Sequence, residues 1–351
     1  MHSSTAPDSR RAVALWLLAC CALVFAMVMV GGLTRLTHSG LSIVEWQPVM
    51  GALPPLDDAD WQETFGKYKR TPEFQQRNFD MTLGEFKGIF WWEYAHRLLG
   101  RFIGVVFLLP FLYFLARRRI DRPLAWRLAV IFVLGGLQGA VGWLMVKSGL
   151  VDDPRVSSLR LAAHLGMAFL IYAAMLWTAL GLLANGQGHA KPANVALSRG
   201  LAILVFVQVL AGALVAGIHA GYAYNTFPLM DGRWIPDEIL VIEPAWKNLV
   251  YNMATVQLDH RAIAYLIVLG ALVLWWRVRR DGLVSLRARR WADALAALVV
   301  LQVCAGIATL LMRVPVPLAA IHQAGALAVF TCAIALAHAL SGSRLGGRLQ
   351  A

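Results

Sequence analysis

The chain has 351 residues, of which 59% are hydrophobic and only 15% are charged, and its mean hydropathy is +0.60. These values exclude a water-soluble globular domain and indicate a protein that crosses a membrane several times. The formal net charge of +12 would also suit a nucleic-acid-binding protein, but the basic residues do not gather in one solvated domain. We therefore expect contact with the lipid bilayer and none with nucleic acid.

Eight runs of the sequence are long and apolar enough to cross the hydrocarbon core of a bilayer as helices, which takes about 20 residues. In chain order they occupy residues 12–33, 88–116, 124–146, 159–184, 201–218, 249–276, 291–312 and 317–340. Continuous apolar runs of this length, without a soluble domain beside them, predict an all-α polytopic membrane protein with eight transmembrane helices.

Lysine and arginine concentrate on one side of this predicted bundle. The N-terminal tail and the connections at residues 117–127 and 277–290 are rich in arginine and poor in acids, whereas the alternate connections balance basic with acidic residues. By the positive-inside rule both termini are cytoplasmic. The expected location is the cytoplasmic (inner) membrane of a bacterium.

The last four spans repeat features of the first four in the same order. AHR at 95–97 matches DHR at 259–261, LQGAVG at 137–142 matches LQVCAG at 301–306, and AAHLG at 162–166 matches AIHQAG at 320–325. Gly31 precedes His38 by seven residues, as Gly212 precedes His219. We expect two four-helix units in the same orientation, residues 1–187 and 188–351.

Four histidines fall within spans in the outer third of the predicted bundle: His96 with His164 in the first half, and His260 with His322 in the second. Two helices that each present a histidine at matching depth bind a haem iron from both faces. A single intramembrane histidine is more often a core residue bonded to a carbonyl, but two pairs at the same depth favour haem. Zinc is the weaker alternative, because neither half offers a third ligand at helical spacing except an acid.

An arginine follows directly after one histidine of each pair. Arg97 follows His96 and Arg261 follows His260. Arginine suits bidentate pairing with carboxylates, so both residues are candidates for binding haem propionates. The alternative is that they extend to the outer headgroups of the bilayer.

The two halves differ one helical turn before these histidines. Glu93 precedes His96 by three residues, whereas Gln257 holds the equivalent position before His260. An acid at one site and an amide at the other suggest that the first site does chemistry and the second carries electrons or has a structural role. Glu93 is thus the candidate catalytic residue, and the alternative is a partner for an interfacial arginine.

Three segments carry a more specific signal: GGLTRLTHSGLSIVEWQPVMGALPPL at 31–56, EYAHRLLGR at 93–101 and AGYAYNTFPLMDGRWIP at 220–236. With the paired histidines, they resemble the heme A synthase family from the first span to the last. The resemblance implies an eight-helix oxidoreductase that oxidises a ring methyl of heme O to a formyl group by successive hydroxylations. It also implies roles for five residues: Glu93 and His96 fill an E-x-x-H motif, His164 is the opposing ligand of the substrate haem, and His260 with His322 bind the iron of a cofactor haem b.

Residues 34–87 contain no cysteine pair, so the chain is similar to the branch of the family that lacks one, which includes the mitochondrial form. The partners that the resemblance implies are heme O, a heme O synthase (farnesyltransferase), an electron acceptor and the cytochrome oxidase assembly machinery. A homo-oligomer is left open. We interpret His38 and His219, which do not match ligands of the family, as interface residues.

Two other functions stay open on the sequence. A dihaem b-type electron carrier linked to quinol needs the same four histidines but no acid over one haem. A haem-handling assembly factor binds haem and forms no product. Pigment analysis separates all three, because only a synthase supplied with heme O makes heme A.

Overall fold

The computed structural model describes residues 7–47, 50–184 and 190–341, and these residues form helices with no β-strand beyond one isolated bridge. Eight of the helices are long and apolar enough to cross a membrane, which confirms the predicted class and number of spans. They are α1 (Pro7–Leu36), α4 (Leu83–Ala116), α5 (Arg122–Lys147), α6 (Ser158–Leu182), α7 (Pro192–Gly217), α9 (Met253–Arg280), α10 (Leu286–Leu311) and α11 (Val316–Ser341). The predicted boundary at 187/188 lies outside the described residues.

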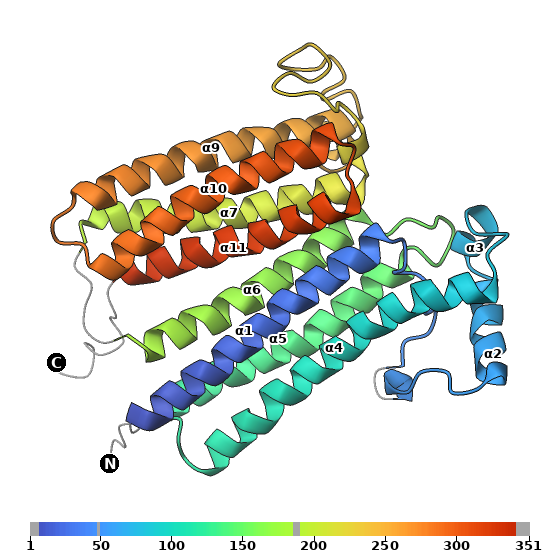
Figure 1. Ribbon diagram of the computed structural model, residues 1–351, viewed down its shortest axis with the longest axis horizontal. Helices are drawn as coiled ribbons and strands as arrows, with labels where there is room; N and C mark the ends of the chain where they lie inside the picture. Colours follow the sequence, from blue (N-terminus) through green and yellow to red (C-terminus); the bar gives the residue numbers. More distant parts are fainter. Residues whose placement is uncertain (1–6, 48–49, 185–189, 342–351) are drawn as a thin grey trace.

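The spans pack as two groups that follow one another along the chain (Figure 1). In the first group α1 contacts α4 and α6, and α5 contacts α4 and α6; in the second, α9 and α11 each contact α7 and α10. The groups meet through α1, α6, α7 and α11. There the rings of Phe169 and Phe330 lie 5.2 Å apart, and the hydroxyls of Tyr172 and Thr331 are hydrogen-bonded at 2.9 Å. The remaining four spans are much less buried and face the lipid.

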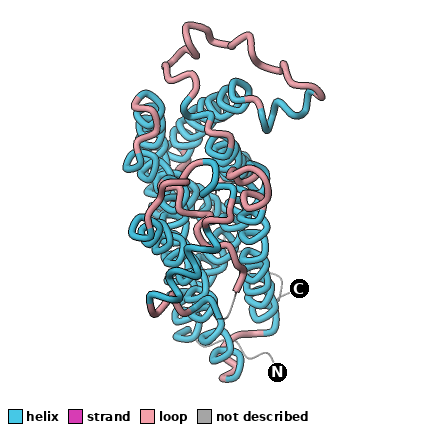
Figure 2. The backbone as a smooth tube through the Cα atoms, turned by 90° about the vertical axis from the view of Figure 1, so that its right-hand side faces the viewer, coloured by secondary structure: helices cyan, strands magenta, loops and turns pink. Residues whose placement is uncertain are grey.

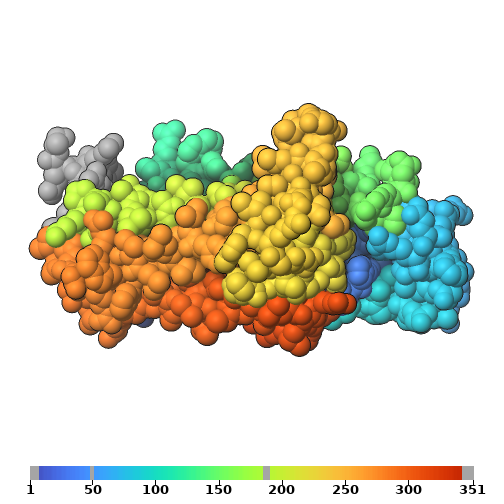
Figure 3. Space-filling view, turned by 90° about the horizontal axis from the view of Figure 1, so that it is seen from above, coloured from blue at the N-terminus to red at the C-terminus, as the bar shows by residue number. Residues whose placement is uncertain are grey.

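Helices α1, α5, α7 and α10 run toward one end of the bundle, and α4, α6, α9 and α11 return from it (Figure 1). We call this end, with its connections 37–82, 148–157, 218–252 and 312–315, the loop end. Figure 2 looks onto it and shows the connections lying over the helix ends. Figure 3 shows that the connection between α7 and α9, yellow to gold, stands out from the helical body. The arginine-rich connection 117–121 lies at the opposite end, as does the connection 281–285, which arginines at the end of α9 and the start of α10 flank.

Helix α4 begins five residues before the predicted span, because its first turns extend beyond the apolar run. Thr82 caps it: the Thr82 backbone N–H donates to the Glu85 carboxylate at 2.8 Å, and the Thr82 hydroxyl accepts from the Glu85 N–H. Two short helices, α2 (Asp58–Tyr68) and α3 (Pro72–Gln76), pack near these turns. Aromatic side chains of α2 and α4 form a small second core: Trp61, Phe65, Tyr68, Phe86, Phe90 and Tyr94.

The span predicted at 249–276 is two helices. α8 (Asn248–Tyr251) ends where Asn252 adopts an extended conformation, and α9 starts at Met253. The Asn252 side-chain oxygen accepts from the N–H groups of Ala254 and Thr255 at 2.9 and 3.1 Å, which is an N-cap. Three 3-10 turns complete the loop end: η1 (Met50–Ala52), η2 (Ala220–Tyr222) and η3 (Ala245–Lys247).

Candidate functional site

The four intramembrane histidines lie in the helices that return from the loop end, each in the part nearest that end. His96 is on α4, His164 on α6, His260 on α9 and His322 on α11. All four are half-buried, although each lies in an apolar span. Half-buried rings at matching positions of both halves are available to a ligand that enters between the helices.

Each of these rings packs against a glycine on the preceding, antiparallel span. A Cβ atom on Gly31, Gly142 or Gly306 would lie 2.7–2.8 Å from Cε1 of the facing histidine, and one on Gly212 would lie 3.2 Å away. The facing pairs are Gly31 with His96, Gly142 with His164, Gly212 with His260, and Gly306 with His322. The four glycines therefore leave the room in which the rings lie.

In the second half the two rings face each other. The ring centroids of His260 and His322 are 6.5 Å apart and the ring planes make an angle of 73°. A metal that binds one nitrogen of each ring at about 2 Å separates the ring centres by about 6 Å. Nδ1 of both rings, and of His96, is buried and has no hydrogen-bond partner in the described chain. The spacing fits two axial ligands of one metal.

The donor set also indicates which metal group the histidine pairs suit. Within residues 7–47, 50–184 and 190–341, no group of three or more His, Cys, Asp and Glu side chains gathers as a metal cluster would. A structural zinc site takes four ligands from the protein and a catalytic one takes three, whereas haem brings four nitrogen ligands of its own. Two histidines per half fit haem.

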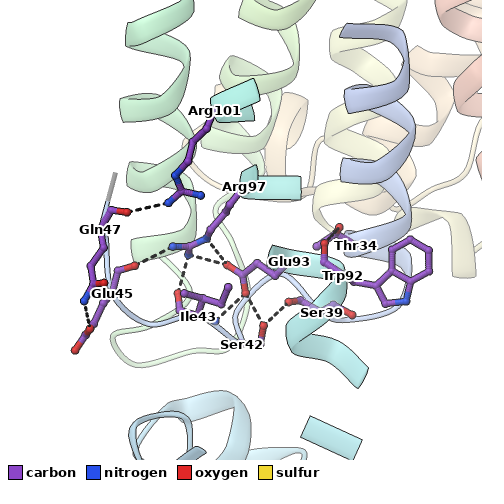
Figure 4. Close-up of polar contacts among 10 residues, drawn as sticks. All are labelled: Thr34, Ser39, Ser42, Ile43, Glu45, Gln47, Trp92, Glu93, Arg97 and Arg101. Atoms are coloured by element: carbon purple, nitrogen blue, oxygen red, sulfur yellow. Dashed lines mark hydrogen bonds and ion pairs between the residues drawn. The ribbon is translucent and has the colours of Figure 1, made fainter. Parts of the chain in front are cut away.

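Glu93 is buried, with 3% of its surface exposed, and its carboxylate holds the segment that follows α1 (Figure 4). The Ser42 hydroxyl and the Ile43 backbone N–H donate to Oε2 at 2.7 and 2.8 Å. Arg97 forms an ion pair with Oε1 at 2.7 Å. The carboxylate thus connects α4 to the 42–47 segment, a contact that the sequence did not reveal.

Arg97 extends the same network. Its Nη1 donates to the Glu45 carbonyl at 2.8 Å and its Nη2 to the Ile43 carbonyl at 2.7 Å. One turn later, Nη2 of Arg101 donates to the Gln47 carbonyl at 2.8 Å (Figure 4). All three guanidinium nitrogens of Arg97 thus donate to the protein, and the role of Arg97 toward a propionate stays a prediction.

The second half repeats this network with an amide in place of the acid. Nε2 of Gln257 donates to the Ala220 and Ala223 carbonyls at 2.8 and 2.7 Å. Nη2 of Arg261 donates to Oε1 of Gln257 at 2.6 Å and to the Tyr224 carbonyl at 2.9 Å. Both halves thus fix the loop that follows their first span through a pair of residues four apart on their second span.

Three glutamines near the histidines were not predicted from the sequence as site residues. Each donates from Nε2 to the main-chain carbonyl of a site histidine: Gln138 to His164, Gln208 to His260 and Gln302 to His322, at 2.9, 3.0 and 2.8 Å. Each also stands four residues before the glycine that faces the same ring. The signal was present as Q-x-x-x-G in LQGAVG, LQVCAG and VQVLAG at 207–212.

His38 and His219 lie outside the spans, in the turns after α1 and α7. Both have a left-handed backbone, with φ of 53° and 59°. Burial, with the nearby Arg35 and His38, lowers the pKa of His219 to about 4. Arg35 itself reaches across to donate to the Ala216 carbonyl of α7, so this region joins the two halves.

Comparison with known proteins matches nearly the whole chain. The model of the COX15-CtaA family, described as cytochrome oxidase assembly protein, covers residues 14–334. The chain is 54% identical over 335 residues to the heme A synthase of Nitrosospira multiformis, with 94% of both chains covered. It is 52% identical over 334 residues to that of Nitrosomonas eutropha, again with 94% of both covered, and 50% identical over 339 residues to that of Parvibaculum lavamentivorans, with 95% of both covered.

Proposed function

Because the chain belongs to the COX15-CtaA family, the family of the heme A synthases, we propose that it oxidises a ring methyl of heme O to a formyl group by successive hydroxylations. The observation that carries this proposal is the set of four half-buried histidines, each facing a glycine, two in each group of spans. Similarity to a heme A synthase over 94% of the chain supports the same conclusion.

In this proposal the two histidine pairs hold different haems. His96 and His164 would bind the iron of heme O, and His260 and His322 that of haem b, as the resemblance to the family implies. Bound there, haem b would supply a redox centre that exchanges single electrons. The exposed apolar side chains of α4, including Leu98, Phe102 and Val105, offer the isoprenoid tail of the substrate a lipid-facing surface.

We assign the chemical asymmetry of the halves to Glu93. Removal of electrons from a methyl group builds positive charge on its carbon, and a carboxylate near that carbon stabilises the charge or takes the proton. Glu93 lies one turn before His96, and Gln257 at the equivalent position of the second half carries no charge. The ion pair with Arg97 fixes the position of the carboxylate.

The eight apolar helices and the family fit a multi-pass protein of the inner membrane. We further propose that the loop end, with the histidines, lies on the outer side of the membrane. The arginines of the connection 117–121 and those that flank the connection 281–285 are at the opposite end, which the positive-inside rule places in the cytoplasm.

Product analysis tests this function. The chain is produced together with a heme O synthase in a host that makes no heme A, and haems are extracted and identified by mass. We expect heme A with the wild-type chain and only heme O with a His164→Ala variant of equal abundance. Bound haem without any heme A would instead favour the dihaem electron carrier or the haem-handling assembly factor.

A further inference from the structure

Three of the four site histidines share a backbone contact that the fourth lacks. The carbonyls of His164, His260 and His322 each accept a hydrogen bond from a glutamine amide of the neighbouring span, at 2.8–3.0 Å. No described side chain donates to the His96 carbonyl. The exception, His96, belongs to the pair that we propose binds the substrate haem, so this inference rests on the proposed function.

Methionine replaces glutamine at the fourth position. The three glutamines stand four residues before the glycine that faces the histidine ring; four residues before Gly31 stands Met27. A thioether has no N–H or O–H group, so Met27 cannot donate to the His96 carbonyl. A Cβ atom on Gly100 would lie 3.0 Å from Cε of Met27, so the methionine side chain lies beside α4 one turn after His96.

Where methionine replaces glutamine, the residue four positions after the histidine also differs. The residue four positions after His164, His260 and His322 is alanine, whereas four positions after His96 it is Gly100. Glycine leaves the room that the Met27 methyl group occupies. At three sites a glutamine four residues before the facing glycine thus occurs with an alanine four residues after the histidine. At the His96 site the same two positions hold methionine and glycine.

A glutamine that donates to the carbonyl of a ligand holds the backbone from which the ligand projects. In an apolar interior this contact also satisfies the second lone pair of a carbonyl that water cannot reach. The His96 ring is held by its packing against Gly31 and by its helix, without such a tie. The least restrained of the four ligands therefore belongs to the site whose haem has to enter and leave in every turnover.

We propose that Gln138, Gln208 and Gln302 are positioning residues that hold three haem ligands in place, and that Met27 leaves His96 as the ligand that releases the iron of the substrate haem. With haem bound, the exchange would be one of ligands only: the His96 ring nitrogen would give up the iron, and an external ligand would take its place. No electron is transferred in this step.

Carbon monoxide binding to the dithionite-reduced, haem-loaded protein tests the proposal, because carbon monoxide binds a haem with two histidine ligands only when one of them leaves. Haem content is measured first on each sample. In the wild type we expect the first-half haem to bind carbon monoxide about fivefold more tightly than the second-half haem. Wild-type protein without any bound haem would count against the proposed function itself. Protein that binds haem but shows equal carbon monoxide affinity at both haems would count only against the present proposal.

Reciprocal variants exchange the two pairs of residues. Gln208→Met with Ala264→Gly should make the second haem reactive, raising its carbon monoxide affinity about fivefold, the factor of one hydrogen bond of about 1 kcal/mol. Met27→Gln with Gly100→Ala adds a bond and should lower the affinity of the first haem by the same factor. This second variant keeps the test decisive if the first variant loses its haem.

The single variants Ala264→Gly and Gly100→Ala are the controls for the small residue alone, and we expect less than half of the effect from either. Haem-containing double variants with wild-type carbon monoxide affinity would overturn the proposal. So would equal affinities of the two haems in the wild type.

Discussion

Nη2 of Arg97 lies 2.7 Å from Oε1 of Glu93, four residues earlier on the same helix. The equivalent contact in the second half joins Arg261 to Gln257 at 2.6 Å, and there the acceptor is an uncharged amide. Both pairs hold the loop that follows the first span of their half. The architecture needs an acceptor at this position and does not need a charge, and this difference is the basis on which we propose a chemical role for the Glu93 carboxylate.

Glu93→Gln should lower heme A formation by about 100-fold or more, the usual loss when a group that stabilises charge or moves a proton is removed. The amide keeps an acceptor for Arg97, but its NH₂ group leaves the Ile43 N–H without one. Heme A formed per bound heme O is the measurement.

Ser42→Ala is the matched control, because it removes one donor to the Glu93 carboxylate and leaves the charge in place. We expect less than about a tenfold loss of activity from it. Equal losses in Glu93→Gln and Ser42→Ala would mean that Glu93 acts only by anchoring the loop.

Gly142→Ala should displace the His164 ring, since the new Cβ would lie 2.8 Å from its Cε1 atom. Overpacking of this kind costs about 1–3 kcal/mol, and we expect the first-half haem to bind correspondingly more weakly. Gly139→Ala on the same helix meets nothing within 4 Å and should leave haem affinity unchanged. Haem titration of both variants measures the affinity of the first-half site for haem. Similar affinities of Gly142→Ala and Gly139→Ala would argue against a His164 ring packed on Gly142.

Arg261→Lys should loosen the loop after α7 while keeping the charge. An ammonium group cannot replace a guanidinium whose Nη2 contacts Gln257, Tyr224 and Thr226 while its Nη1 donates to the Leu229 carbonyl. We expect a loss of about 1–3 kcal/mol in local stability. Amide hydrogen exchange over residues 220–236 measures it. Arg233→Lys, in an exposed ion pair with Asp237, is the control and should change exchange little. If haem b content falls while exchange stays normal, Arg261 acts on the propionates instead.

Glu73 should make the α2–α3 segment less stable as the pH rises. Burial raises the pKa of the Glu73 carboxyl from 4.5 to about 7, and the Tyr68 hydroxyl donates to it at 3.3 Å. The folded segment therefore keeps a proton that the unfolded segment releases. Its stability is greatest below about pH 4.5, falls by about 3 kcal/mol as the pH rises to 7, and is constant above that.

Glu73→Gln removes this titration and should give a segment whose hydrogen exchange protection, corrected for the intrinsic rate, is the same at pH 5 and pH 8. The wild-type chain should lose protection over residues 57–81 between these values. A wild-type segment with constant protection would contradict the assignment.

The spans and the positions of the four histidines within them were predictable because their signals are local. A run of about 20 apolar residues and a repeated AHR or DHR are visible without knowledge of packing. The start of α4 is set by the Thr82 cap and the small aromatic core, so hydropathy placed it too late.

Contacts between distant segments were not predictable. Ser42 and Ile43 bind Glu93 across about 50 residues of chain, and no periodicity reports that. Gln208 shares its spacing to Gly212 with Gln138 and Gly142. In the sequence Gly212 pairs with His219 by spacing, whereas in the structure it faces the His260 ring. The four-residue spacing between glutamine and glycine identifies a histidine site only when the helix that faces the glycine is known.

The haem content and axial ligation of the purified chain test the central claim most directly. Electron paramagnetic resonance and haem quantification should show two low-spin haems per chain in the wild type loaded with heme O, each with two histidine ligands. His322→Ala should lose haem b and keep heme O, and His164→Ala should do the reverse. A chain that binds fewer than two haems when loaded, or that keeps both ligation signatures in these variants, would contradict the account.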